Sequence, residues 1–409
     1  MSLPRKPDDP SHFGDFTGLV NTRSRKAIGL KGLYQATNVL LADDKRLYRR
    51  PGMVPYFTGV VRGGFTVGDD VYLDDAGSLK RRVSPTDIRV VTSGLTGRAY
   101  SCAVLNGVGY YCNGVESGVV RGDLHQPLRI EAPTLTGVVV QNSTALVPGF
   151  ARMGADYVTA KWRFCATYET ADGREGPPSA VFVLDAPVTA SLFRVACSTA
   201  YAKTHIYCTE PDGTTFRRIG TTVATVSTWT PALAGRVLTH SGTYPLPRTV
   251  ERLAFHRGKL YAAEYIADDD STVIWYSLPY GFHLFDQSDD YLRVPGRVVM
   301  MQEIADGKPL LLVTTQQVLT VTDDALAVEA DYGAPLGHIG DVTAEGMAYF
   351  WTTRGLCSAM PFKNLHEADL SVAPGMYAVC KLAYINGSEL AITITQGGGT
   401  PFNRRSEVT

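Results

Sequence analysis

The sequence predicts an almost all-β protein with more than one domain, on three observations. Short runs rich in β-branched and aromatic residues are interrupted about every ten positions by Gly, Asp, Asn or Pro, which is typical of strands joined by tight turns. Long helical periodicity is nearly absent. The 409 residues exceed the roughly 250–300 at which a single hydrophobic core stops growing, so two or three domains are expected.

Composition and charge narrow the class of protein. Hydrophobic residues make up 44% and charged residues 19% of the chain, which predicts folded structure over most of its length. Lys and Arg total 39 against 40 for Asp and Glu, so the net charge of -1 argues against attachment to nucleic acid by bulk electrostatics. Seven cysteines, an odd number without a CxxC pair, argue against a disulfide framework, and we expect mostly reduced thiols in strands.

The first element is an extended N-terminal arm over residues 1–55, which is Gly-rich and weakly patterned. Its first fifty residues hold ten basic and five acidic side chains, a net charge of +5. An extended basic arm ahead of a neutral body can dock on a neighbouring subunit, and it can equally be a solvated tail strand. No apolar segment follows its basic residues, so we expect no secretory signal and synthesis in the cytoplasm.

The second and fourth elements, residues 56–150 and 246–409, predict the two parts of a β-propeller. Residues 65–79 and 102–114 alternate in strand fashion around Gly-Asp, Asp-Ala-Gly and Asn-Gly turns. Residues 253–263 and 346–356 show the same order of strand, turn and strand. Units of this size cannot bury their own faces, and a propeller stacks them around a central channel. The number of blades stays open.

The third element, residues 151–245, differs in character and predicts an inserted β-sandwich. Strand-like runs at 164–170, 181–183, 204–208 and 216–219 are joined by turns rich in Gly, Pro and Asp. Alternating strands of about seven residues in a module of about 100 residues are typical of a fibronectin III/immunoglobulin-like layout. The most apolar stretch of the whole chain, residues 309–313, is far shorter than the roughly 20 residues of a membrane helix, so we expect no membrane-spanning segment.

A search for catalytic and metal-binding patterns gives no candidate. Phosphate-loop, dinucleotide, nucleophile-elbow, zinc-protease and EF-hand motifs are all missing. The Asp-box repeat typical of sialidases is missing too, and only its tail occurs, at Val226–Trp229. We therefore expect no catalytic residue, no metal site and no cofactor.

Three N-terminal stretches carry a resemblance to a known family. They are FTGLVNT at 16–22, ATNVL at 36–40 and RLYRRPG at 46–52. Together they resemble the opening of tailed-bacteriophage virion proteins, among them the tail nozzle or packaged-DNA stabilisation proteins of short-tailed phages. Residues 273–279 and 334–337 resemble late strands of the same group more loosely.

The resemblance implies a tail structural protein whose β-propeller subunits form a ring, commonly of six copies. Such a ring extends and closes the DNA channel below the portal and adaptor and conducts the genome on ejection. The implied partners are further copies of the chain, the portal, adaptor and other tail proteins, and transient double-stranded DNA. The implied location is the tail of the virion, after synthesis in the host cytoplasm. A near-neutral body suits a conduit, because a strongly basic lumen would hold phosphates.

The resemblance also marks five candidate assembly residues: Asn38, Arg49, Arg50, Pro51 and Gly52. We expect the Arg pair to anchor the arm on an acidic neighbouring surface and the Pro-Gly step to turn the chain into the first blade. A plain strand-terminating turn explains the same residues equally well.

Two other functions remain open. A host-receptor module would bind a cell-surface glycan or anchor a fibre, and exposed aromatic rings with convergent polar groups on one face would favour it. A glycan-cleaving propeller would need two carboxylates held across a concave site.

Overall fold

The computed structural model describes residues 57–141 and 159–365. Within them it leaves short gaps, at 58, 85, 98–99, 189, 191, 232–233, 289–290, 305–308, 323–324, 343–346 and 360. The described chain consists of small, mostly antiparallel sheets, and its one helical segment is a 3-10 turn at Ala267–Asp269. The predicted all-β class is therefore confirmed.

Two meander sheets begin the described chain, and both contain the predicted hairpins. In the second sheet Asn106 and Gly107 have φ angles of 50° and 73°, as a two-residue hairpin turn with right-handed strand twist requires. The strands of the first sheet are β5 (Val61–Val67), β6 (Asp70–Asp75), β7 (Ser78–Arg82) and β8 (Ile88–Ser93). Those of the second are β9 (Ser101–Leu105), β10 (Val108–Cys112), β11 (Ser117–Arg121) and β12 (Leu124–Pro127).

Three further meander sheets follow after the sandwich. The third sheet holds β20 (Val250–His256), β21 (Lys259–Ile266), β22 (Ser271–Leu278), β23 (Gly281–Phe285) and β24 (Tyr291–Pro295), the last two both pairing with β22. The fourth holds β25 (Val298–Glu303), β26 (Leu310–Thr314), β27 (Val318–Thr322) and β28 (Ala325–Ala330). The fifth holds β30 (Gly340–Val342), β31 (Ala348–Thr352), β32 (Gly355–Ala359) and β33 (Lys363–Asn364).

These five sheets stack face to face, so that each hydrophobic core lies between two successive sheets. Strand β26 shows the arrangement, because its residues alternate between two cores. Leu310 and Leu312 pack with the third sheet, whereas Leu311 and Val313 pack with the fifth. A strand buried on both faces is apolar at every position, which explains the continuous apolar run at 309–313.

The first strands of successive sheets also lie side by side. Leu253 N on β20 donates to Ser101 Oγ on β9 over 3.1 Å. On its other side β20 contacts β25, where Arg252 Nε donates to the Val299 carbonyl over 3.0 Å. Strands β9, β20 and β25 thus form one continuous row along the stack.

The sandwich consists of two sheets that face each other across their own core. Phe164 and Ile206 from one sheet pack against Phe193 and Val195 from the other. The three-stranded sheet has the order β13 (Leu135–Val140), β16 (Phe193–Cys197) and β19 (Val226–Trp229). The four-stranded sheet has the order β15 (Phe182–Pro187), β14 (Thr159–Glu169), β17 (Lys203–Cys208) and β18 (Arg217–Thr222).

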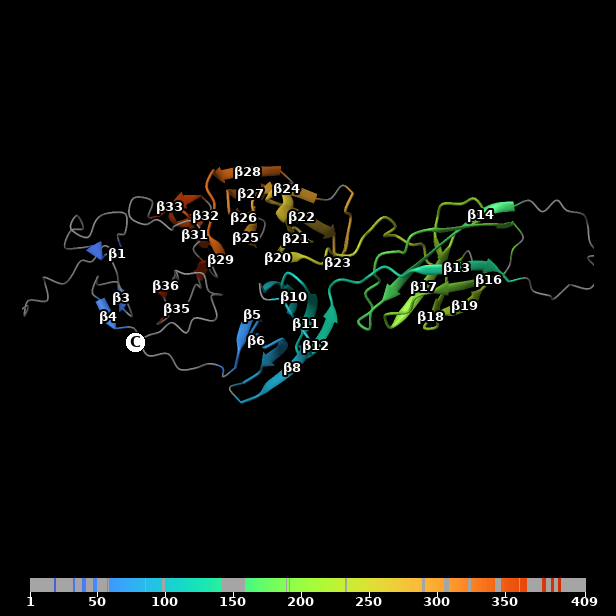
Figure 1. Ribbon diagram of the computed structural model, residues 1–409, viewed down its shortest axis with the longest axis horizontal. Coiled ribbons are helices and arrows are strands. Elements are labelled where there is room, and N and C mark those ends of the chain that lie inside the picture. Colours follow the sequence, from blue (N-terminus) through green and yellow to red (C-terminus); the bar gives the residue numbers. More distant parts are fainter. Residues whose placement is uncertain are drawn as a thin grey trace, which may run out of the picture.

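Backbone carbonyls of the loop after β14 and of the end of β12 fix the sandwich to the body formed by the five sheets. His283 on β23 donates from Nε2 to the Glu175 carbonyl at 2.8 Å, and His240 Nε2 donates to the Gly176 carbonyl at 3.1 Å. Arg174 Nη2 donates to the Pro127 carbonyl at the end of β12 over 3.0 Å. Figure 1 shows the result, an elongated molecule with the sandwich strands β13–β19 at one end of the body.

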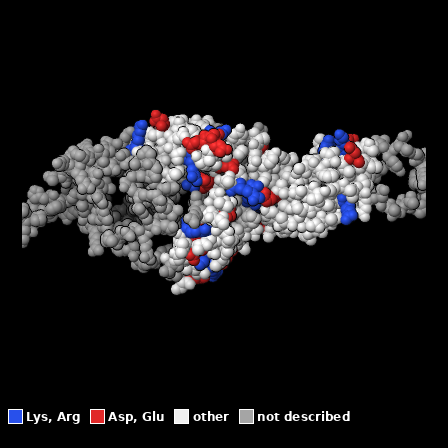
Figure 2. Space-filling view, viewed as in Figure 1, with Lys and Arg blue, Asp and Glu red and all other residues white. Residues whose placement is uncertain are grey.

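Charged side chains of both signs are interspersed over the face drawn in Figure 2, with no band of one sign among the described residues. Six described cysteines are free thiols in strands, as predicted, and Cys380 lies outside the described residues. Within the same part of the chain, no helix has the length and apolar character needed to cross a membrane.

Outside the ranges 57–141 and 159–365 only the backbone of short strands is described. In the predicted arm these are β1 (Gly18–Leu19) beside β2 (Gly32–Leu33), and β3 (Val39–Leu41) beside β4 (Leu47–Arg49). Near the C-terminus they are β34 (Tyr377–Val379), which pairs with β29 (Leu336–His338), then β35 (Tyr384–Ile385) and β36 (Glu389–Leu390). The domain boundaries stay predictions, and β13, which precedes residue 151, belongs to a sandwich sheet.

Candidate functional site

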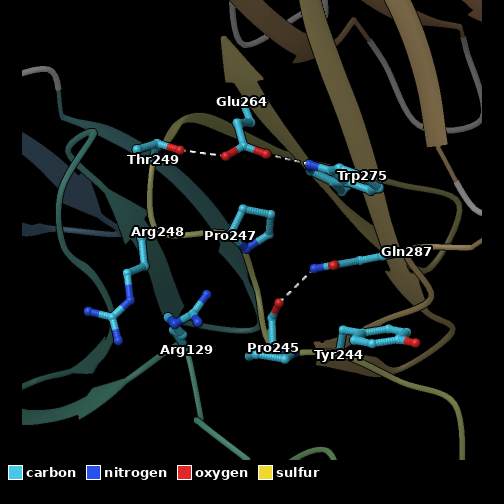
Figure 3. A pocket seen from close by; sticks show the side chains of 9 residues that line it. All are labelled: Arg129, Tyr244, Pro245, Pro247, Arg248, Thr249, Glu264, Trp275 and Gln287. Carbon is cyan, nitrogen blue, oxygen red and sulfur yellow. Dashed lines mark hydrogen bonds between the residues drawn. The ribbon is translucent and has the colours of Figure 1, made fainter. Parts of the chain in front are cut away.

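A groove of about 490 Å³ lies where the chain returns from the sandwich to the third sheet. Its walls come from the segment after β12, the segment before β20, strands β21 and β22, and the turn between β23 and β24. We call it the junction groove. It is lined by Arg129, Tyr244, Pro245, Pro247, Arg248, Thr249, Glu264, Trp275 and Gln287, all drawn in Figure 3.

Trp275 forms one wall, and its ring is held in a fixed orientation. The indole Nε1 donates a hydrogen bond of 3.0 Å to Glu264 Oε2 on the neighbouring strand β21. The ring also packs on Tyr291 of β24, with 5.4 Å between the ring centroids. A large aromatic surface is thus presented without free rotation of the side chain.

Glu264 is held from two sides by neutral donors. Besides the Trp275 indole, the Thr249 hydroxyl donates to Glu264 Oε1 over 2.5 Å. Among the described residues no cation forms an ion pair with this carboxylate. Each carboxylate oxygen has two lone pairs, so both oxygens keep the capacity to accept a further hydrogen bond.

Tyr244 and Gln287 complete the wall on the side of Trp275. The backbone of Tyr244 is paired in both directions with Phe285, at 2.7 and 3.1 Å, while its side chain is 48% exposed. Gln287 Nε2 donates to the Pro245 carbonyl over 3.0 Å. Figure 3 shows Gln287 between the two aromatic rings, with Pro245 and Pro247 between this wall and the arginines opposite.

Arg129 and Arg248 form the opposite wall and share one carboxylate. Arg129 binds Glu131 through two bonds, of 2.7 and 2.8 Å, and also donates to the Leu246 carbonyl. Arg248 Nη2 contacts the same carboxylate at 2.6 Å, and its side chain is 73% exposed. Hydrogen bonding from Arg129 lowers the pKa of Glu131, against the opposing effect of burial, and Arg248 lowers it further. This wall therefore carries two positive charges and one negative charge.

The groove offers a ligand aromatic surface, hydrogen-bond acceptors and cations. Glu264 lines the groove, and Glu131 in the opposite wall is ion-paired to both arginines, whereas glycoside hydrolysis needs one of two carboxyl groups to act as an acid across the bond that breaks. No group of three His, Cys, Asp or Glu side chains able to hold a metal ion occurs among the described residues. Burial raises the pKa of the Cys102 and Cys208 thiols to about 12, so neither is an activated nucleophile.

The structure does not describe the side chains of the candidate assembly residues. Asn38, Arg50, Pro51 and Gly52 lie outside the described residues. Arg49 is the last residue of β4, and only its backbone is described. Their assembly role stays a prediction.

Sequence reasoning missed the junction groove for a physical reason. Its residues come from chain segments up to 158 positions apart, between Arg129 and Gln287, and no local period connects them. The one local signal is the sequence PLPRT at 245–249, a proline-rich segment that directly precedes a strand.

Comparison with known proteins gives no family. No protein-family model matches the chain, and no curated protein matches it. Among solved structures, it is similar to the extracellular domain of a one component system from B. thetaiotaomicron, with 7% identity, 79% of this chain and 36% of that chain covered, and a TM-score of 0.27. It is also similar to Porphyromonas gingivalis dipeptidyl peptidase 4, with 10% identity, 80% and 55% covered, and a TM-score of 0.26. The chain thus spans about a third and about half of these proteins, and such low scores carry no argument about its fold or function.

Proposed function

We propose that this protein is a structural subunit of a phage tail, the nozzle ring that extends and closes the DNA channel below the portal and adaptor. The observation that carries the proposal is the stack of five meander sheets, with a core between each successive pair and β9, β20 and β25 in one row. A stack of this kind supplies a stiff wall for a channel. The resemblance at residues 16–52 is the reason for proposing a phage tail as the location of this channel.

At the level of the fold, we propose a β-propeller with an inserted immunoglobulin-like or fibronectin III-like sandwich. Up-and-down sheets of four strands, stacked face to face with their first strands adjacent, are the building units of a propeller. In the third sheet β23 and β24 pair with different parts of β22, so together they take the place of one outer strand. The seven sandwich strands are divided three and four, as in a constant-type immunoglobulin domain, but their order differs. The first, fourth and seventh strands form one sheet here, whereas the third, sixth and seventh do so in that layout.

Conduction of DNA is consistent with the charge balance of the chain. A protein that neutralises many phosphates with Lys and Arg releases counterions and binds DNA tightly. Here the net charge is -1, and both signs are mixed over the face drawn in Figure 2. Weak contact with phosphates would allow the genome to slide.

Ring closure needs two unlike surfaces on each subunit, because a ring is built from head-to-tail contacts. The outer strands β8 and β28 each end a sheet and lie on opposite sides of the body in Figure 1. Each exposes an aliphatic side chain, Val90 at 60% and Val328 at 58%. We propose that β8 of one subunit faces β28 of the next.

Light scattering on the purified chain, alone and with the portal and adaptor proteins of the same virion, tests this function. We expect a ring-sized mass for the wild type and a shift towards the monomer for Val90→Glu and Val328→Glu, since each buries an unpaired carboxylate in the contact. Val223→Glu, at a 75% exposed sandwich position, is the matched control and should assemble normally. A wild type that stays monomeric in both settings contradicts the ring, and two edge variants that assemble normally contradict the choice of strands.

The alternative function, recognition of a host glycan, is favoured by one observation. The junction groove combines exposed and half-buried aromatic rings with polar groups that converge on the same space. A tail protein can hold such a site whether or not it also forms the channel.

A further inference from the structure

We infer that the junction groove binds an acidic saccharide, a hydroxyl-rich sugar ring that carries one carboxylate. The inference goes beyond the ring function, because a groove within one subunit can bind a sugar in a monomer or in a ring. It stands on three features of the groove, which are its aromatic wall, its fixed carboxylate and its pair of arginines.

The aromatic wall supplies the surface on which a sugar ring stacks. Trp275 is pinned by its bond to Glu264 and by its contact with Tyr291. The backbone of Tyr244 is paired with Phe285, and its ring is about half exposed beside Trp275. The Trp275 ring, already held in place, offers apolar contact area at little cost in side-chain entropy.

Glu264 supplies acceptors for sugar hydroxyls at one end of the groove. Its two oxygens are oriented by Thr249 and Trp275, which are neutral donors. No described cation therefore neutralises its negative charge. Gln287 adds an amide oxygen, since its Nε2 is the atom bound to the Pro245 carbonyl. A ligand that meets this end must donate hydrogen bonds, as a polyol does.

The arginine pair supplies the charge preference at the other end. Arg129 and Arg248 together hold one carboxylate, that of Glu131, which leaves one positive charge in excess. Arg129 already donates three hydrogen bonds, two to Glu131 and one to the Leu246 carbonyl. Arg248 makes one ion pair and is largely exposed. Arg248 is therefore the group able to bind a carboxylate of the ligand. A sugar with hydroxyls at one end and a carboxylate at the other matches both walls.

The size of the groove fits this class of ligand. Its volume of about 490 Å³ lies within the roughly 300–1,000 Å³ typical of small-molecule sites. Trp275 and Arg129 are held by hydrogen bonds before any ligand arrives. Binding would thus need little reordering of the protein.

Isothermal titration calorimetry on the full-length chain tests the inference with two probes. One is a disaccharide of glucuronic acid and N-acetylglucosamine, and the other is the same disaccharide with its carboxyl group reduced to an alcohol. We expect the wild type to bind the acidic probe about tenfold more tightly than the reduced one, the size of one charge-assisted hydrogen bond. Arg248→Gln should abolish this preference while leaving the affinity for the reduced probe unchanged.

Two controls separate binding from folding and from assembly. Arg293→Gln removes an exposed, ion-paired arginine on β24 that does not line the groove, and should bind both probes as the wild type does. Tyr244→Ala should weaken both probes together, because it removes stacking surface and no charge. Binding is read from heat and assembly from mass, so either can fail alone. The inference is overturned if the wild type binds neither probe at millimolar concentration, if it binds both equally, or if Arg248→Gln keeps the preference.

Discussion

At the residue scale, the joint between sandwich and body depends on a histidine that is partly buried and neutral. His283 donates to the Glu175 carbonyl from β23, where burial lowers its pKa to about 4. The hydrogen bond to the carbonyl and the charge of Asp172 act in the opposite direction, while Arg174 and His240 add to the lowering. A proton on His283 would place a second positive charge near Arg174 in a partly buried joint.

This lowered pKa makes stability fall with acidity. Between about pH 6.5 and pH 4 the unfolded chain binds a proton at this position and the folded chain does not. The free energy of unfolding therefore decreases as the pH falls. Going from pH 7 to about pH 4.5, His283 alone should cost about 2 kcal/mol. The stability is present above the unfolded pKa and is lost as the pH approaches the folded one.

We predict that His283→Gln removes most of this pH dependence, because glutamine keeps a donor for the Glu175 carbonyl and cannot titrate. Urea unfolding at pH 7 and at pH 4.5 measures the difference. His283→Ala serves as the comparison, since it loses both the donor and the proton site and should be destabilised at both values. Equal pH dependence in wild type and His283→Gln would show that His283 is not the titrating group.

At the element scale, the turn residues made the hairpins predictable. They carry no information about which distant strands pair in a sheet, so those pairings could not be predicted. The hairpin β9–β10 follows from Asn106 and Gly107, which adopt the left-handed angles that such a turn needs. The pairing of β13 with β16, and of β16 with β19, joins segments tens of residues apart, and no turn residue encodes it. Register between distant strands is decided by the face that each buries, which a single strand does not reveal.

The turn at Gly107 gives the prediction that belongs to this scale. A Cβ at Gly107 would meet nothing within 4 Å, so Gly107→Ala is strained by its φ of 73° alone. We expect a loss of about 1 kcal/mol in the free energy of unfolding, measured by urea denaturation.

Gly137→Ala on β13 is the matched control, because its Cβ also meets nothing within 4 Å and its φ is not positive. That substitution should be neutral or slightly stabilising, since it restricts the unfolded chain. Equal losses at both positions would mean that backbone strain is not the cause.

At the scale of the whole molecule, the sandwich stands at one end of a body of stacked sheets, and the junction groove lies where the two are joined (Figure 1). The all-β class followed from the sequence because strand periodicity is local. The groove did not, because Arg129, Glu264 and Trp275 meet only after the third sheet has formed beside the returning chain. The contacts of the proposed ring are harder still to predict from the sequence, since they would lie between copies of the chain.

The central claim is that copies of this chain close a ring around a channel. Electron microscopy of the purified chain bound to the portal and adaptor proteins of the same virion measures this most directly. We expect a closed ring of subunits coaxial with the portal, with a central opening wide enough for double-stranded DNA. Single copies attached at the periphery of the portal–adaptor complex, with no ring around its axis, would contradict it.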